Sequence, residues 1–275
     1  MIYLPRRLAY AGGPGDCAFP GSPYSLGNMV AYDSLAVHYD AVTGDCAAEV
    51  ALIEGIIRRA RSQAATLLEV ACGTGQVIAS LAAGYQVSGL DISSAMLAVA
   101  GEKVPDGTPL YLADMSSFNL GMTFDVIVCV YHGINHLLDF SDWEGFFDCA
   151  YQHLNYGGLL IFDVITIHDL EMMARSPRTA QQFGDNYLLI RVRDSGQAIF
   201  DWDIEVFELQ SSGKYILIPE VIRTTSFPHE KIQKALGEKF ADVSTIASDG
   251  GVVANDDALN RIWFACTKAK RREPA

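Results

Sequence analysis

The chain has 275 residues, half of them hydrophobic, and its 33 acidic and 20 basic side chains give a net charge of −13. This length allows one large domain or one domain carrying an insert. The acidic excess disfavours a nucleic-acid partner, because binding to a phosphate backbone usually requires a basic surface. We expect no membrane partner and a cytoplasmic location, since no apolar stretch has membrane length and the N-terminus lacks the apolar core of a signal peptide.

Along the chain, residues 1–30 are rich in glycine and proline without periodicity, which predicts a flexible N-terminal arm. Apolar residues at helical spacing then predict a helix over residues 45–63. Strand and helix patterns alternate afterwards, with strands at 67–70, 86–90, 110–112, 125–131 and 159–165, and further strands near 243 and at 261–267. Regular alternation with short links predicts an α/β fold, a doubly wound and mostly parallel seven-stranded sheet of the Rossmann-like kind.

Two helix starts are predicted from capping residues. Ser93 or Ser94 can cap the helix that follows the second strand. Residues 141–144, Ser-Asp-Trp-Glu, match a capping box and predict a second helix start there.

The pattern changes after residue 165, where long strands at 187–193, 198–209 and 215–227 are separated by short polar turns. This spacing predicts an antiparallel β meander, an insert over residues 167–226 that interrupts a ligand-binding domain formed by 31–166 and 227–275. In the middle strand, the alternation from Phe200 to Val206 predicts one buried and one exposed face. An exposed meander edge could pair with a second copy, so a homodimer is a further hypothesis.

The first strand leads into a glycine loop. Gly73 and Gly75 lack Cβ atoms and allow the backbone to approach a ligand, while Glu69 can hold a ligand ammonium group. A dinucleotide fingerprint needs a third glycine or alanine where this chain has Ile78, so NAD is disfavoured. The alternative for this loop is an ordinary tight turn between a strand and a helix.

Acidic residues also end the next two strands. Asp91 can accept hydrogen bonds from both hydroxyls of a ribose, and Asp114 can accept from an adenine amine while Met115 packs on the ring. Singly, Asp91 could be a helix cap and Asp114 an ordinary turn residue. Acidic residues that end three consecutive strands, at the edge where such sheets bind ligands, favour a nucleotide-like ligand.

These motifs resemble class I S-adenosylmethionine (SAM) methyltransferases, over about residues 31–166 and the C-terminal strands. Residues 69–75 resemble the E-x-x-C-G-x-G loop of that superfamily. Together with the Tyr39-Asp40 segment, the loop at residues 129–137 and the meander, they resemble the small-molecule branch that includes bacterial sugar-amine N,N-dimethyltransferases. The resemblance implies SAM as cofactor, S-adenosylhomocysteine as product, and cofactor contacts by Tyr39, Ala71, Ile92 and Val130 in addition to the residues above.

The loop after the fourth strand is the natural place for the acceptor. His136, or less favourably His132, could take a proton from an amine, because an unperturbed histidine titrates near pH ~6.5. In the resembling sugar N-methyltransferases, residues that match His136 and Tyr32 lie near the acceptor amine. The alternative for His136 is a loop histidine that only shapes the pocket. Histidine and cysteine spacings suggest no metal site.

Two functions therefore stay open. The first is a SAM-dependent methyltransferase that methylates a nitrogen, or less favourably an oxygen, of a small metabolite. The second is a SAM-binding sensor or accessory subunit without catalysis, which intact SAM motifs do not exclude. The acceptor-side loop, with its histidines, favours the enzyme.

Overall fold

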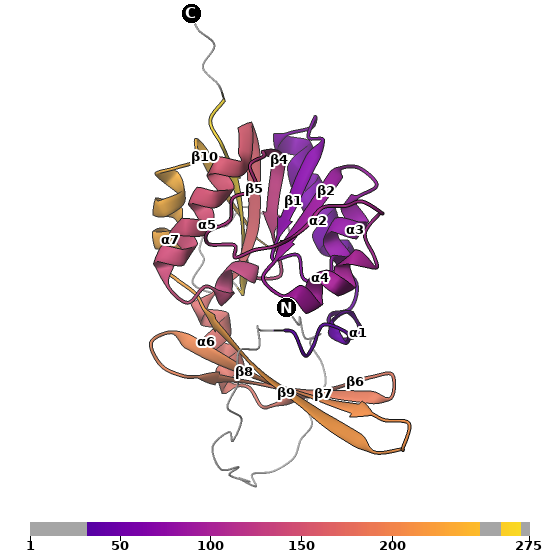
Figure 1. The fold of residues 1–275 in the computed structure, drawn as a ribbon. Helices are drawn as coiled ribbons and strands as arrows, with labels where there is room; N and C mark the ends of the chain where they lie inside the picture. Colours follow the sequence, from indigo (N-terminus) through magenta and orange to yellow (C-terminus); the bar gives the residue numbers. More distant parts are fainter. Residues whose placement is uncertain (1–31, 248–259, 271–275) are drawn as a thin grey trace, which may run out of the picture.

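The computed structural model describes residues 32–247 and 260–270, and the predicted arm at residues 1–30 lies outside these ranges (Figure 1). The strands are β1 (Thr66–Val70), β2 (Gln86–Asp91), β3 (Leu110–Leu112), β4 (Phe124–Cys129), β5 (Leu154–Ile165), β6 (Thr179–Phe183), β7 (Asn186–Asp194), β8 (Ile199–Leu209), β9 (Tyr215–Thr225), β10 (Asp242–Ala247) and β11 (Arg261–Thr267). The helices are α1 (Tyr39–Thr43), α2 (Ala47–Ala60), α3 (Gln76–Leu81), α4 (Ser94–Gly101), the 3₁₀ turn η1 (Gly133–His136), α5 (Phe140–His153), α6 (Ile167–Arg175) and α7 (His229–Gly237).

Seven strands form the large sheet, in the order β10-β11-β5-β4-β1-β2-β3. The strands β3, β2, β1, β4 and β5 pair in parallel, whereas β11 runs antiparallel to both β5 and β10. The order reverses between β1 and β4, and open sheets of this kind bind ligands at such a reversal, beyond the carboxyl ends of the strands. The predicted Rossmann-like, mostly parallel seven-stranded sheet is confirmed.

Helices cover both faces of this sheet. Leu68, Ile127 and Phe162 point to the side of α5 and α7, while their neighbours Leu67 and Val128 point to the side of α2 and α3. Burial on both faces explains why these strands are continuous apolar runs in the sequence. In the described ranges, no helix is long and apolar enough to cross a membrane.

The two predicted helix caps have different outcomes. The Ser93 side chain accepts a hydrogen bond from the Met96 amide at the start of α4, which confirms that cap. The capping box predicted at residues 141–144 is wrong, because α5 begins at Phe140 after Asp139, which makes no side-chain cap bond. Phe140 packs against Phe227, and this tertiary contact lies in the first turn of the helix.

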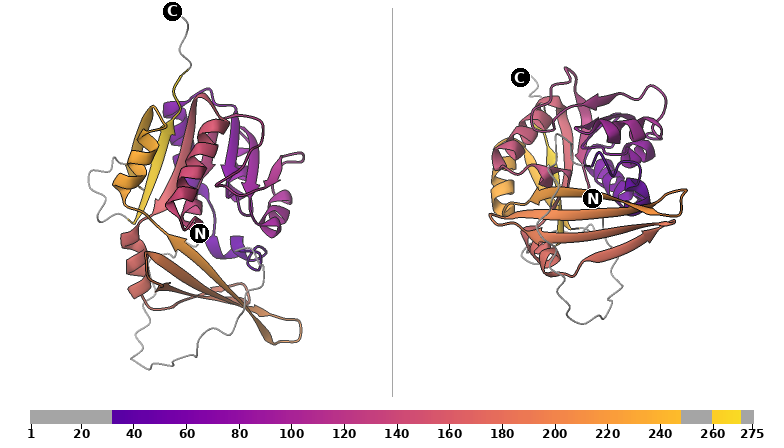
Figure 2. Two further views of the ribbon diagram at one scale, coloured as in Figure 1. Left: turned by 60° about the vertical axis from the view of Figure 1, so that its left-hand side comes forward. Right: turned by 60° about the horizontal axis from the view of Figure 1, so that its bottom comes forward.

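The strands β6 to β9 form a separate four-stranded antiparallel sheet. Figures 1 and 2 show this smaller sheet lying across one end of the large sheet, with α1 and α6 between them. Phe200, Trp202, Ile204 and Val206 are buried on one face of β8, as the alternation predicts. The sequence did not predict α6 or β6, because β6 reads Thr-Ala-Gln-Gln-Phe, without an apolar alternation.

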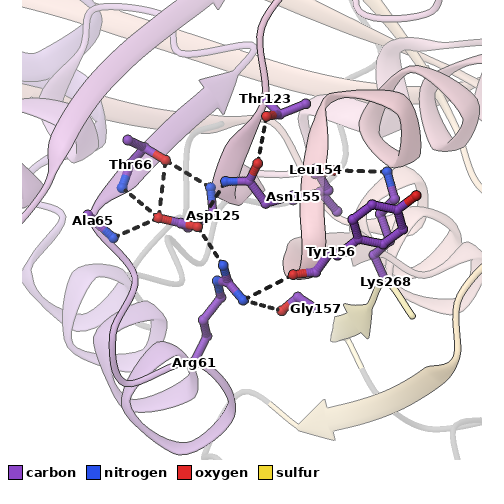
Figure 3. Close-up of polar contacts among 10 residues, drawn as sticks. All are labelled: Arg61, Ala65, Thr66, Thr123, Asp125, Leu154, Asn155, Tyr156, Gly157 and Lys268. Atoms are coloured by element: carbon purple, nitrogen blue, oxygen red, sulfur yellow. Dashed lines mark hydrogen bonds and ion pairs between the residues drawn. The ribbon is translucent and has the colours of Figure 1, made fainter. Parts of the chain in front are cut away.

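The end of the large sheet away from the small sheet is held by one carboxylate (Figure 3). Asp125 accepts hydrogen bonds from the Ala65 and Thr66 amides (2.9 and 3.2 Å), from Arg61 (2.6 Å) and from Asn155 (3.0 Å). Burial raises the pKa of Asp125, but the bonds from Ala65, Arg61 and Asn155 outweigh it and hold the pKa well below its ordinary value. Asp125 thus joins α2, β1, β4 and β5.

We expect Asp125→Asn to destabilise the protein by about 2 kcal/mol, because hydrogen bonds to a charged group contribute more than neutral ones. Since the folded pKa is lowered, the stabilisation is present above pH ~4 and is lost as the pH falls towards the folded pKa. Urea unfolding at pH 7 and at lower pH measures both effects. Equal stability of variant and parent at pH 7 would contradict the expectation.

Candidate functional site: a cavity at the carboxyl ends of the strands

The glycine loop follows β1 and turns the chain into α3. Ala71, Gly73 and Gly75 all have positive φ (55°, 52° and 75°), so the backbone turns sharply here. A Cβ atom added to Gly73 would meet nothing within 4 Å, whereas one on Gly75 would lie 2.9 Å from the Cβ of Ala100. Gly73 therefore leaves open space for a ligand, and Gly75 allows close packing of the loop on α4.

A cavity of about 810 Å³, its open mouth included, lies beside this loop. Its lining comes from the glycine loop and the start of α3, from the end of β2, from the segment before α2 and from the loop after β4. The lining residues are Tyr32, Tyr39, Thr43, Glu69, Ala71, Cys72, Gly73, Thr74, Gln76, Val77, Asp91, Ile92, Met96, Met115, Val130, Tyr131, Gly133 and His136. Most residues assigned to the site from the sequence are thus brought together in one place.

Two buried carboxylates face the cavity. Asp91 accepts hydrogen bonds from the Gly73 amide (2.8 Å) and the Ser93 amide (2.9 Å), so it also fixes the glycine loop. Glu69 accepts one from the Ile78 amide (3.2 Å). Burial raises the pKa of Asp91 and raises that of Glu69 well above its ordinary value.

These carboxylates fit SAM. Among the described residues that line the cavity, Glu69 and Asp91 are acidic and none is lysine or arginine. A buried carboxylate without a nearby cation has a raised pKa, and a ligand that brings positive charge relieves this cost. SAM carries a sulfonium and an ammonium group, and its ribose hydroxyls can donate to a carboxylate. Glu69 would hold the ammonium group and Asp91 the ribose hydroxyls. Gly73 would leave room for the amino-acid portion of SAM.

Glu69→Gln should raise the melting temperature of the ligand-free protein while it weakens SAM binding about 10-fold. The neutral amide keeps an oxygen for the Ile78 amide and removes the cost of ionising a buried carboxyl, whose pKa burial raises well above its ordinary value. Thermal unfolding with and without SAM separates the two effects. A variant with a lower melting temperature and unchanged SAM affinity would contradict this reading of Glu69.

Three residues assigned from the sequence lie outside the lining of the cavity. Gly75 packs on α4, and His132 is buried behind the loop. Asp114 is exposed and accepts hydrogen bonds from the amide and hydroxyl of Ser116 (2.8 and 2.7 Å). Contact of Asp114 with adenine therefore stays a prediction, while its neighbour Met115 lines the cavity.

The loop after β4 forms the opposite side of the cavity. Tyr131 and His132 both have positive φ (56° and 60°), which is unusual for two consecutive residues other than glycine. Within η1, Nε2 of His136 lies 3.2 Å from the Tyr32 hydroxyl, and Nδ1 lies 3.3 Å from the Arg223 carbonyl. Burial lowers the pKa of His136 to about 4, so the imidazole is neutral near pH 7.

A charged network supports this loop from behind. Asp163 of β5 accepts hydrogen bonds from the His132 amide (3.1 and 3.2 Å) and from Arg261 Nε (2.7 Å), and lies 2.5 Å from His132 Nδ1. Burial raises the pKa of Asp163, but Arg261 and His132 outweigh it and lower the pKa below its ordinary value. Arg261 also donates to Glu49 of α2 (3.0 Å). Residues far apart in the chain thus hold the strained Tyr131–His132 turn.

Residues 32–43 form a bridging segment between the two sheets. Asp33 accepts from the Ser93 hydroxyl (2.5 Å), and Asp40 accepts from Thr74 of the glycine loop and pairs with Lys103. On the other side, Glu220 of β9 accepts from the Tyr32 amide and the Ser34 hydroxyl. The sequence did not predict these contacts, although its Tyr39-Asp40 segment resembles that of the sugar-amine N,N-dimethyltransferases.

Comparisons with known proteins agree with this site. A family described as a methyltransferase domain matches residues 67–158. The chain is 34% identical over 116 residues, 42% of its length, to the dTDP-3-amino-3,6-dideoxy-α-D-glucopyranose N,N-dimethyltransferase of Streptomyces fradiae, of which it covers 45%. It spans about half the length of the curated sugar dimethyltransferases that it matches.

Solved structures extend the similarity beyond that stretch. The sugar N-methyltransferase KedS8 from Streptoalloteichus has 25% identity and a TM-score of 0.76, with 93% of this chain and 100% of that chain covered. SAM-bound CalS10, an amino pentose methyltransferase from Micromonospora echinaspora, shares the fold at 22% identity, with a TM-score of 0.69 over 89% of this chain and 100% of that chain.

The fold, the glycine loop and the carboxylates at the strand ends define a class I SAM-dependent methyltransferase domain. Over about half its length, the chain is distantly homologous to sugar N,N-dimethyltransferases.

Proposed function

We propose that the protein transfers a methyl group from SAM to a nitrogen of a small metabolite. The observation that carries the proposal is the position of His136 and Tyr32, which line the same cavity as Glu69 and Asp91. Methylation of an amine requires a proton acceptor near the methyl group, and a neutral imidazole can act as one. A SAM sensor has no such requirement. Similarity to a sugar N,N-dimethyltransferase and to KedS8 supports nitrogen over oxygen as the acceptor atom.

Bound SAM supplies a methyl group on a sulfonium, for in-line displacement by the acceptor nitrogen. The protein aligns the two groups and excludes water, and such alignment can account for much of the rate enhancement. As the N–C bond forms, the electrons of the S–C bond stay on sulfur and the nitrogen becomes cationic. Nε2 of His136 accepts the N–H of the acceptor, and the proton finally passes to solvent. We assign this role to His136, since His132 is paired with Asp163 behind the loop.

A pKa of about 4 refines the role of His136. Such an imidazole accepts a hydrogen bond at neutral pH but does not stay protonated. It therefore orients the neutral amine and passes the proton of the methylated amine on to solvent. In this proposal, residues 167–226 form the acceptor side of the site and residues 31–166 with 227–275 form the SAM-binding domain.

The test uses methyl-labelled SAM, metabolite extracts and one defined probe, dTDP-3-amino-3,6-dideoxyglucose, chosen from the relative in Streptomyces fradiae. Mass spectrometry should detect labelled products in amounts that match the S-adenosylhomocysteine formed. Fragmentation then locates the new methyl group on nitrogen or oxygen. Tight SAM binding by calorimetry without S-adenosylhomocysteine above background, across all extracts, would favour a sensor or accessory subunit instead.

A further inference from the structure

Asn135 lies next to His136 and joins the acceptor loop to both sheets. Its side chain is fully buried, at 0% exposure. The amide nitrogen donates to the Ile165 carbonyl (3.1 Å) and the Thr225 carbonyl (2.6 Å), and the amide oxygen accepts from the Ile165 amide (3.1 Å). These partners are the last residues of β5 and β9, so one side chain connects η1, the large sheet and the small sheet.

The same end of β9 carries the partner of His136. The Arg223 carbonyl lies 3.3 Å from Nδ1 of His136 and is two residues before Thr225 on the same strand. Because Asn135 fixes the distance between η1 and the end of β9, it also keeps the His136 ring beside that carbonyl. A carbonyl oxygen only accepts hydrogen bonds, so Nδ1 must carry the proton. Nε2 then has one lone pair, which faces the Tyr32 hydroxyl at 3.2 Å. Both residues line the cavity, so an acceptor N–H reaches this lone pair by taking the place of the Tyr32 hydroxyl.

We propose that Asn135 is a positioning residue that fixes the Nδ1-protonated tautomer of His136 and aims its Nε2 lone pair at the acceptor. The proposal rests on the function proposed above, in which Nε2 accepts from the substrate. Asparagine suits this junction because it offers two donors to two carbonyls and an acceptor to one amide. Aspartate keeps the shape and loses both donors, and an apolar residue would leave all three backbone groups unpaired.

The test first examines the parent protein, labelled with ¹⁵N in histidine, by NMR. The ring nitrogens show which of them carries the proton, and the His136 signals are assigned as those missing from His136→Gln. We expect the proton on Nδ1 in the parent. A proton on Nε2 would overturn the proposal without any variant, and without knowledge of the acceptor.

Asn135→Ala is the second step. We expect the His136 signals to become those of a tautomer mixture, and its titration midpoint to move up from about 4 as solvent enters. The matched control is Asn155→Ala, a removal of the same amide at the opposite end of the sheet, beside Asp125 (Figure 3). It should destabilise the fold and leave the His136 signals unchanged. If Asn135→Ala does not fold, Asn135→Asp takes its place. Unchanged His136 signals in a folded Asn135 variant would overturn the proposal.

Kinetics with a confirmed acceptor separate this proposal from the proposed function. Asn135→Ala should lower kcat roughly 10- to 100-fold with little change in SAM affinity, since misplacement of a reacting group by about 1 Å has an effect of this order. Adding His136→Ala to Asn135→Ala should then cause a much smaller loss than His136→Ala alone. Multiplicative losses would overturn the positioning role. Absence of any methylated product contradicts the proposed function and leaves the NMR result to decide on Asn135.

Discussion

Asp91→Ala should weaken SAM binding about 100-fold, corresponding to about 2.7 kcal/mol. Two effects add. The carboxylate lies at the end of β2, where it would accept from the ribose hydroxyls, and hydrogen bonds to charged groups contribute about 1.5–3 kcal/mol each. It also accepts from the Gly73 amide at 2.8 Å, so its loss frees the glycine loop that must approach the ligand. Isothermal titration calorimetry with SAM measures the change directly.

The control for this expectation is Asp114→Ala. Asp114 lies two residues after the end of β3 but is exposed and bound to Ser116, outside the cavity lining. If Asp114 stays bound to Ser116 when the cofactor binds, the change in SAM affinity is less than about 5-fold, within the range of an exposed contact. If Asp91→Ala binds SAM as tightly as the parent, the ribose assignment is wrong. If Asp114→Ala binds as weakly as Asp91→Ala, the adenine contact predicted from the sequence holds, and residues 113–116 must change shape when the cofactor binds.

The sequence predicts the large sheet well because burial on both faces leaves a strong signal. The central strands β1, β4 and β5 contain apolar runs, and the acidic residues Glu69 and Asp91 lie at the carboxyl ends of β1 and β2. The strand β6 was missed because one of its residues, Phe183, is buried and it has no apolar alternation. The helix α6 was missed although Ile167, Leu170 and Met173 follow helical spacing, and of these Leu170 is buried. The start of α5 depends on the packing of Phe140 against Phe227, which is a tertiary contact.

The candidate site divides in the same way. Residues on strand ends and in the glycine loop could be found, because topology alone brings them to one edge of the sheet. Asn135 could not, since its partner Thr225 is 90 residues away and the bond is to a backbone carbonyl. Arg261 is 98 residues from Asp163. It is the first residue of the apolar strand β11, and nothing in that sequence pattern indicates that its charge is buried. Such partners depend on how the small sheet sits against the large one, and one sequence contains no signal for this.

His136→Ala should lower kcat about 100-fold and leave SAM affinity nearly unchanged, because general acid–base groups contribute about 10²- to 10⁴-fold and this imidazole acts mainly as an acceptor. His136→Gln, which retains an acceptor atom, should recover part of the loss. The matched control is His168→Gln, which changes an exposed histidine of α6 outside the cavity lining. Initial rates with labelled SAM and a confirmed amine acceptor measure all three. Full turnover in His136→Ala would remove His136 from the chemistry without contradicting methyl transfer itself.

The pH dependence gives an independent check on His136. Its pKa is lowered to about 4 by burial, while an unfolded histidine titrates near pH ~6.5. Between these values the unfolded chain binds a proton that the folded protein does not, so the contribution of His136 to stability falls as the pH is lowered from about 6.5 to 4. In His136→Gln this part of the dependence of stability on pH should disappear, which urea unfolding at several pH values can measure.

Because the pKa of His136 is lowered to about 4, protonation of His136 should not reduce kcat above pH ~5. A loss of turnover below pH ~6.5 that is absent in His136→Gln would instead indicate a histidine with an ordinary pKa and would contradict the lowered pKa of His136.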